Sequence, residues 1–266
     1  MAAKLSPEPW ALSPLIVIVG PTASGKSALA LELAQKFNGE IIAADSRTVY
    51  KGMDIGTAKP TEEEQKLVPH HLLDLVNPDQ PFNVANFQGS ALEKIKEIRG
   101  RGKLPIMVGG TGLYVDSVLF SYGFSDKNAE KSSVNPRHLA KPSDARGPIR
   151  GNTLVLGMDV DKNLLEDRIT KRVEQMVKGG LAEEVRRLVD KFGWESEAMT
   201  GVGYQEWKKY FESSQNLEET IELIAIHTRQ YAKRQRTWFK RNSHIIWLQS
   251  SGLAQKIVTA FLAHNN

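Results

Sequence analysis

Cysteine is absent from the 266-residue chain. Its absence excludes a disulfide framework, a zinc site built on thiolates, an iron–sulfur cluster and a cysteine nucleophile. Long apolar runs are lacking too: none approaches the roughly 20 residues that span a bilayer, and residues 1–14 contain no apolar stretch typical of a secretory signal. With 41% hydrophobic and 25% charged residues, the composition is that of a globular protein. We therefore expect a folded cytoplasmic protein with no membrane partner.

Acidic residues are missing from the C-terminal end. No Asp or Glu follows Glu222, whereas seven basic residues do. They are Arg229, Lys233, Arg234, Arg236, Lys240, Arg241 and Lys256. Four of them, Arg229, Lys233, Arg236 and Lys240, recur at spacings of 4, 3 and 4 and should share one helical face. This excess of positive charge favours a polyanionic partner, although a solvated basic helix face stays open as the alternative.

Strand and helix patterns alternate along the first 120 residues. Apolar runs at 15–19, 40–44 and 103–108 have the length and composition of buried strands, and residues 27–37, 87–98 and 111–120 have helical patterns. This alternation predicts an α/β fold, a P-loop NTPase-like parallel sheet flanked by helices. Ligands are then expected at the carboxyl ends of the strands.

Residues 121–151 break this alternation. The segment is polar, contains Pro136, Pro142 and Pro148, and predicts a long loop or flap. Beyond it, strands are expected at 152–160 and 244–248. Helices are expected at 163–192 with an interruption at Gly179-Gly180, and at 206–211, 218–240 and 253–262. The predicted organisation is a P-loop core over 1–120, a flap over 121–151, and the rest of the core with C-terminal helices over 152–266.

Residues 20–27 match the phosphate-binding pattern G-x-x-x-x-G-K-[ST] at every position, between a predicted strand and a predicted helix. The expected diphosphate-binding residues are Gly20, Pro21, Thr22, Ala23, Ser24, Gly25, Lys26 and Ser27. In such a loop the backbone N–H groups and the helix N-terminus face the anion. Lys26 should reach phosphate oxygens, and the Ser27 hydroxyl is a candidate Mg²⁺ ligand. The motif does not say which phosphate compound binds.

The strand position at which ordinary P-loop NTPases have a metal-binding Asp has no carboxylate in this chain. The strand over 104–108 ends in Gly109-Gly110-Thr111-Gly112, whereas those enzymes end a second strand in an Asp. Asp159 ends a later strand, but Asp45 ends the second strand and should lie nearer the phosphate loop. Asp45 is therefore a candidate general base or Mg²⁺ ligand; a turn-capping role is the alternative.

Six segments together resemble the bacterial tRNA dimethylallyltransferases (tRNA isopentenyltransferases). They are GPTASGKS at 20–27, DSRTVYKGMDIGTAKP at 45–60, PHHLLDLVNPDQPFNVANF at 69–87, GGTGLYVDSVL at 109–119, TGVGYQEW at 200–207 and TRQYAKRQRTWFKR at 228–241. The segments follow one another in the family's order, and only residues 121–151 interrupt the resemblance.

The resemblance implies transfer of a dimethylallyl group from its diphosphate to N6 of an adenosine beside the anticodon of tRNA, with Mg²⁺ as cofactor. It gives Asp45 the role of base, places Thr22 and Lys26 at the donor's diphosphate and places Thr111 at the acceptor. The target base must leave its stack to reach a buried diphosphate. The implied contacts to the tRNA anticodon stem-loop are Asp45, Ser46, Arg47, Thr48, Thr111, Arg229, Gln230, Lys233, Arg234, Gln235 and Arg236. Aromatic Tyr231, Trp238 and Phe239 are expected to pack the last long helix onto the sheet, with stacking on tRNA bases as the alternative. The protein is expected to be a monomer.

Two departures from the family pattern stand out. Many relatives have a helical insertion where this chain has only 121–151, which we interpret as a basic flap in its place; a disordered segment with impaired tRNA recognition is the alternative. Its basic residues are Lys127, Lys131, Arg137, Lys141, Arg146 and Arg150. Many relatives also have Arg where Gln205 stands, so either another cation substitutes or catalysis is slower.

Three other functions stay open at this level. One is an isopentenyltransferase that acts on free AMP or ADP, one is a P-loop kinase that binds ATP and phosphorylates a small molecule, and one is an RNA-binding protein without activity. The basic C-terminal segment argues against the first, because a mononucleotide needs no such surface.

Overall fold

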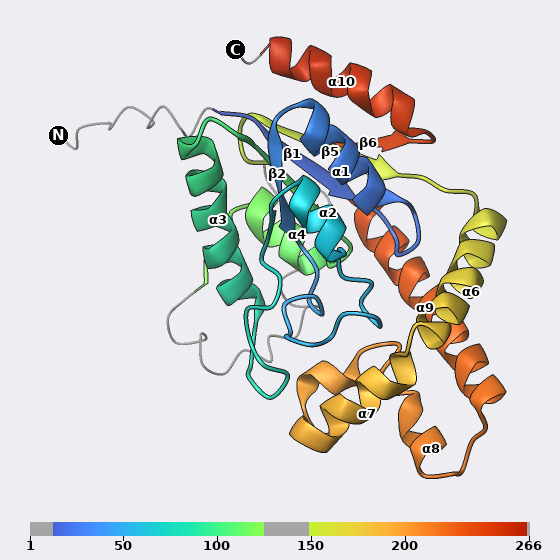
Figure 1. The fold of residues 1–266 in the computed structure, drawn as a ribbon. Helices are drawn as coiled ribbons and strands as arrows, with labels where there is room; N and C mark the ends of the chain where they lie inside the picture. Colours follow the sequence, from blue (N-terminus) through green and yellow to red (C-terminus); the bar gives the residue numbers. More distant parts are fainter. Residues whose placement is uncertain (1–12, 125–148, 265–266) are drawn as a thin grey trace.

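The computed structural model describes residues 13–124 and 149–264. Their centre is a six-stranded sheet in which every paired strand is parallel, in the order β3-β2-β4-β1-β5-β6 (Figure 1). The strands are β1 Leu15–Val19, β2 Gly39–Ala43, β3 His70–His71, β4 Leu104–Gly109, β5 Thr153–Met158 and β6 Ile245–Leu248. The predicted parallel α/β fold is thus confirmed.

The central strands are buried because both faces of the sheet are covered. On one face, α3 (Val84–Gly100) and α4 (Gly112–Leu119) pack over strand residues such as Val17 and Met107. On the other, α1 (Lys26–Lys36) and α10 (Ser251–Ala263) cover Ile16 and Ile106. Alternate residues of β1 point to the two cores, which explains why this strand is apolar without interruption.

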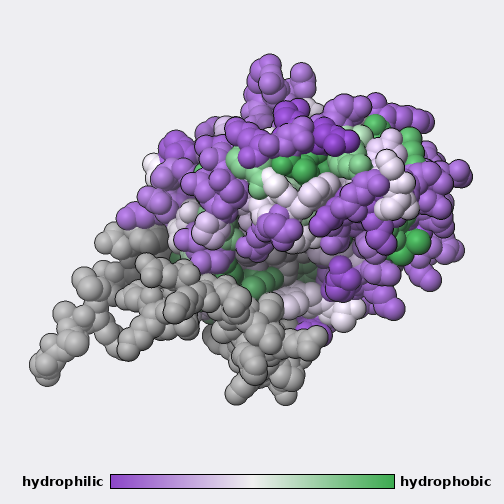
Figure 2. All heavy atoms as spheres, turned by 90° about the horizontal axis from the view of Figure 1, so that it is seen from below, coloured by the Kyte–Doolittle hydropathy of each residue, from purple (hydrophilic) through white to green (hydrophobic). Residues whose placement is uncertain are grey.

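A helical lobe lies at the carboxyl ends of the strands. It contains α6 (Lys162–Lys178), α7 (Leu181–Phe192), the 3₁₀ turn Glu197–Thr200, α8 (Trp207–Phe211) and most of α9 (Leu217–Phe239), and it has its own apolar core around Trp207 and Tyr204. Figure 1 shows α7 and α8 away from the sheet, with α9 running from this lobe back towards β6. Seen from that side, apolar residues gather in the middle of a mainly hydrophilic surface (Figure 2).

Most predicted elements are present, and their ends differ for local reasons. The helix expected at 87–98 begins at Val84, because the Asn83 side chain accepts hydrogen bonds from the N–H groups of Ala85 and Asn86. The short helix α2 (Glu62–Leu67), capped by Thr61, and strand β3 were not predicted. The flap lies mainly outside the described residues. Within the described part of the chain, no helix is both long and apolar enough for a membrane span.

Candidate active site

The P-loop connects β1 to α1 as the motif predicts. Gly25 precedes the helix with φ 89°, a left-handed conformation that favours glycine. The Lys26 ammonium turns back over the loop and donates a hydrogen bond to the Pro21 carbonyl at 3.2 Å. Burial and, to a smaller extent, the neighbouring Arg172 lower the pKa of Lys26, Asp45 raises it, and together they bring it to about 8. Lys26 therefore shares its surroundings with a second cation and a carboxylate.

Asp45 and Thr111 follow the neighbouring strands β2 and β4. The Asp45 Oδ1 atom accepts a hydrogen bond from the Arg47 N–H group at 2.8 Å, and the Thr111 Oγ1 atom accepts one from the Ser46 N–H group at 3.0 Å. A close approach makes this pairing possible, since a Cβ at Gly109 would lie 2.0 Å from the Ala44 carbonyl oxygen. The ends of both strands are thereby held beside the P-loop.

A cavity of about 290 Å³ opens between these strand ends and the helical lobe. Its polar side includes Thr22, Asp45, Ser46 and Arg47, all of which the sequence assigned to the site. Another part of its wall is apolar. It is formed by Ile169, Val173 and Met176 of α6, Val202, and Ile224 of α9. The structure therefore joins a phosphate loop, a carboxylate and a short apolar wall in one cavity.

Arg172 is the residue that sequence reasoning missed. It comes from α6, lines the cavity, and donates a hydrogen bond from Nη2 to the Thr57 carbonyl at 3.5 Å. Burial lowers the pKa of Arg172, and the nearby Asp45 counteracts that effect. With Lys26, it supplies a second positive charge beside Asp45. Its only signal in the sequence is a basic residue in a helix that contains several others.

Helix α9 lines the cavity with one of its faces. Ile224, Thr228 and Tyr231 line the cavity, and Gln235 continues their spacing of 4, 3 and 4. Burial, and then Asp45, raise the pKa of Tyr231 to about 12, while Thr111 and Gln235 act to lower it. Tyr231 is thus a cavity residue, whereas Phe239 is buried in the core as expected.

The basic stripe lies on other sides of α9. Lys233 is two residues, or about 200° of helix rotation, from Tyr231. Arg236 pairs with Asp159 at 2.7 Å, so the alternative carboxylate Asp159 already has a partner, and Arg229 donates a hydrogen bond to the Thr170 hydroxyl at 3.5 Å. Arg234 both lines the cavity and is exposed. Contacts of this stripe with tRNA stay a prediction.

Three other residues assigned to tRNA already have defined places in the fold. Gln235 is buried, and both ends of its amide are hydrogen-bonded within the chain. Thr48 is buried too, and the Arg47 guanidinium donates to the carbonyl of Glu197 at 2.6 Å. Gln230 and Lys233 are exposed. Of the flap's basic residues only Arg150 is described; Lys127, Lys131, Arg137, Lys141 and Arg146 lie outside the described residues.

Comparison with known proteins gives matches to one family of enzymes. The family model of IPP transferase matches residues 48–147 and 124–242, and that of isopentenyl transferase matches residues 13–74. A tRNA dimethylallyltransferase of Oceanobacillus iheyensis is 39% identical over 294 aligned positions, which cover 91% of this chain and 94% of the relative. Because the alignment is longer than this chain's 266 residues, the relative contains residues without a counterpart here.

Solved structures give the same result. The tRNA isopentenylpyrophosphate transferase of Bacillus halodurans superimposes with a TM-score of 0.83 at 33% identity, covering 95% of this chain and 97% of the other. A eukaryotic dimethylallyltransferase acting on tRNA has a TM-score of 0.78 at 26% identity, with 95% and 80% covered. The chain belongs to the IPP transferase family, that of the tRNA dimethylallyltransferases, as its motifs predicted.

Proposed function

We propose that this protein transfers a dimethylallyl group from dimethylallyl diphosphate to N6 of an adenosine next to the anticodon in tRNA. The observation that supports it is the shared cavity, in which the P-loop residue Thr22, the carboxylate of Asp45 and an apolar wall meet. A phosphate loop alone would fit many phosphate compounds. The apolar wall beside it fits a donor whose phosphate chain carries a short hydrocarbon.

The donor is held at both ends in this proposal. Its diphosphate lies on the P-loop, residues 20–27, with Lys26 and Arg172 as counter-charges, and its five-carbon chain lies against Ile169, Val173 and Met176. When the bond between the allylic carbon and the diphosphate oxygen breaks, negative charge grows on the leaving group. Preorganised donors and cations stabilise that charge most in the transition state.

The acceptor supplies the electron pair of the new bond. The N6 amine of adenine attacks the allylic carbon as diphosphate departs, and one N6 proton must leave. Asp45 faces the cavity and can accept that proton. Because the adenine is stacked in the anticodon loop, it has to flip out into the cavity, at a cost of a few kcal/mol that contacts in the pocket offset. Tyr231 and Thr111 would position the flipped base.

Mg²⁺ is the cofactor that this chemistry implies. The hydroxyl of Ser27 and the carboxylate of Asp45 are hard oxygen ligands, and no cluster of three or more His, Cys, Asp or Glu side chains occurs in the described residues. Mg²⁺ needs only one or two ligands from the protein, because water and phosphate oxygens fill the rest of its coordination shell. When bound, the ion would neutralise part of the diphosphate charge.

Two alternatives are less well supported. A small-molecule kinase would need no apolar wall beside its phosphate loop, and an enzyme acting on free AMP or ADP would not need exposed Lys233, Arg234 and Lys240 on and just after α9. Membership of the tRNA dimethylallyltransferase family also favours tRNA. We further propose that the protein works in the cytoplasm, as a monomer.

The test is a direct assay of transfer. Purified protein is incubated with labelled dimethylallyl diphosphate, Mg²⁺ and either unmodified tRNA or AMP, and the digested product is analysed for N6-dimethylallyl adenosine. We expect modified adenosine from tRNA and none from AMP. Product from AMP alone, or ATP turnover without use of the isoprenoid diphosphate, would replace the proposal with the corresponding alternative.

A further inference from the structure

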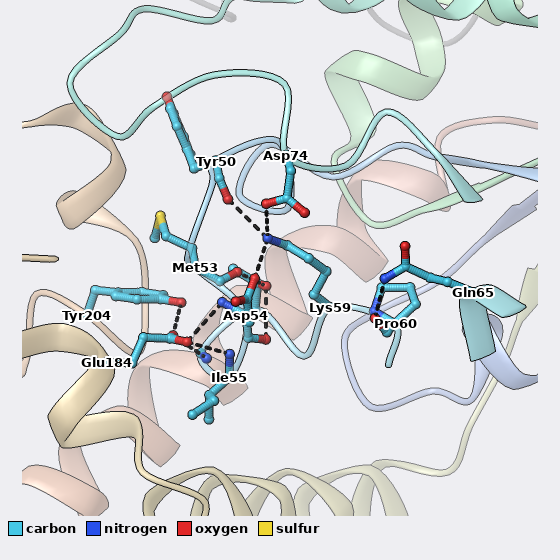
Figure 3. A network of polar contacts seen from close by, with 12 residues as sticks. Tyr50, Met53, Asp54, Ile55, Lys59, Pro60, Gln65, Asp74, Glu184 and Tyr204 are labelled. Atoms are coloured by element: carbon cyan, nitrogen blue, oxygen red, sulfur yellow. Dashed lines mark hydrogen bonds and ion pairs between the residues drawn. The ribbon is translucent and has the colours of Figure 1, made fainter. Parts of the chain in front are cut away.

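Glu184 of α7 is a buried carboxylate whose oxygens are both saturated. Its side chain is 2% exposed. Oε2 accepts hydrogen bonds from the N–H groups of Asp54 at 3.0 Å and Ile55 at 2.9 Å. Oε1 accepts from the Gly56 N–H group at 3.1 Å and from the Tyr204 hydroxyl at 2.8 Å. Figure 3 shows the carboxylate of Glu184 pointing from α7 towards Asp54 and Ile55, at the start of the loop 54–57. Three successive backbone donors are thus gathered by one side chain.

The loop that Glu184 holds is a wall of the cavity. Gly56 and Thr57 line it together with Tyr204. The ring of Tyr204 lies so close to Gly56 that an added Cβ would be 2.5 Å from Cζ. The other end of the loop is tied by Lys59, whose ammonium binds the carboxylates of Asp54 at 2.5 Å and Asp74 at 2.6 Å.

The same loop contacts the cation of the site. The Thr57 carbonyl accepts the hydrogen bond from Arg172 Nη2, and Arg172 is the neighbour of both Lys26 and Asp45. A continuous set of contacts therefore runs from Glu184 through the backbone of residues 54–57 to the Arg172 guanidinium. A shift of the loop would move the carbonyl that orients this charge.

We infer that Glu184 is a positioning residue for the transfer reaction, which places the loop 54–57 and, through the Thr57 carbonyl, the Arg172 guanidinium. This inference rests on the proposed function. Tyr204 assists by donating to the same oxygen and by pressing its ring on Gly56. Glu184 touches neither donor nor acceptor, and its effect on the reaction is carried by Arg172.

Glu184→Gln is the sharpest variant because it keeps the shape of the side chain. A carboxamide has one acceptor oxygen. If that oxygen stays with Asp54 and Ile55, the NH₂ group faces Tyr204 and Gly56, and the Gly56 N–H group loses its acceptor. The matched control is Glu40→Gln. Glu40 is also a buried carboxylate, 5% exposed and bound to Arg101 and His71, but it lies at the start of β2, outside the cavity lining.

The experiment is a double-mutant cycle of Glu184→Gln with Arg172→Lys, measured as kcat/KM for dimethylallyl diphosphate with tRNA saturating. We expect Glu184→Gln to lower kcat/KM roughly tenfold in the wild-type background, as for displaced positioning groups. In the Arg172→Lys background the loss should be under about twofold, because the group that Glu184 positions has changed. Urea unfolding gives the loss of stability in Glu184→Gln and in Glu40→Gln. At a similar loss of stability, Glu40→Gln should leave kcat/KM within about twofold of wild type.

Three outcomes separate the possibilities. Equal losses in both backgrounds would overturn the inference, because Glu184 would then act independently of Arg172. So would a loss no greater than that of Glu40→Gln, since Glu184 would then contribute only to folding. If the wild-type protein transfers no dimethylallyl group to tRNA, the proposed function fails first, and that result is seen before any variant is compared.

Discussion

The side-chain amide of Gln235 is hydrogen-bonded to the P-loop at Thr22. Its Oε1 atom accepts from the Thr22 N–H group at 2.8 Å, while its Nε2 atom donates to the Gly110 carbonyl at 3.0 Å. Gly110 leaves just enough space, since a Cβ there would lie 2.1 Å from Nε2. One residue of α9 therefore connects the loop after β1 with the end of β4. The helix that closes the cavity also sets the position of the phosphate loop.

Replacing this amide should affect both stability and donor binding. Gln235→Leu leaves the Thr22 N–H group and the Gly110 carbonyl without their partner, which costs about 1–3 kcal/mol for a buried polar group. We expect a lower free energy of unfolding in urea and a higher KM for dimethylallyl diphosphate. Gln230→Leu, at an exposed position of the same helix, should change neither the free energy of unfolding nor the KM. If it changes both as much as Gln235→Leu does, the effect comes from a leucine in this helix and not from the lost amide.

The sequence predicts the part of the site that is encoded locally. The run Leu15–Val19 followed by the glycine motif predicts strand, loop and helix together, because each needs only its own neighbours. Asp45 was found by its place at the end of a strand, since parallel strands of one sheet end on the same side. Both predictions can be made without information on how the helices pack.

The residues that the helical lobe contributes to the site could not be predicted from local sequence. Arg172 and Glu184 lie on amphipathic helices rich in charged residues, and helical periodicity cannot say which charge a distant loop will meet. Arg229, Lys233 and Arg236 of the predicted stripe lie on α9 and Lys240 follows its end, but the face that lines the cavity passes through Thr228 and Tyr231. Tertiary packing decides the orientation of α9, and Gln235 marks its contact with the core.

Asp45→Asn should separate proton transfer from donor binding. A positioned base contributes about 10²–10⁴-fold to rate, so we expect kcat to fall by at least about 100-fold while the Kd for dimethylallyl diphosphate in the absence of Mg²⁺ stays within about threefold. Single-turnover transfer and equilibrium donor binding measure the two effects. If the variant instead keeps its rate under saturating donor but needs far more Mg²⁺, Asp45 is a metal ligand and not the base.

Donor binding should weaken as pH rises through about 8. Burial lowers the pKa of Lys26 to about that value in the free protein, so the ammonium is charged below pH 8 and increasingly neutral above it. A bound diphosphate favours the charged form and raises this pKa, so binding near pH 8.5 should take up a proton. Calorimetry in buffers of different ionisation enthalpy measures that uptake. In Lys26→Arg, which stays charged, the uptake should disappear; its persistence would assign the proton to another group.

Substitution of Gln205 tests whether the site has enough positive charge to neutralise the diphosphate. Its side chain lines the cavity and is exposed, and the cations already beside Asp45 are Lys26 and Arg172. If those two neutralise only part of the diphosphate charge, Gln205→Arg should raise kcat up to about tenfold, because a cation aimed at the leaving group acts mainly in the transition state. Gln205→Met, of similar length but without charge or hydrogen bonds, should not reproduce the gain. An unchanged kcat in Gln205→Arg would mean that Lys26 and Arg172 already supply the charge that the leaving group needs.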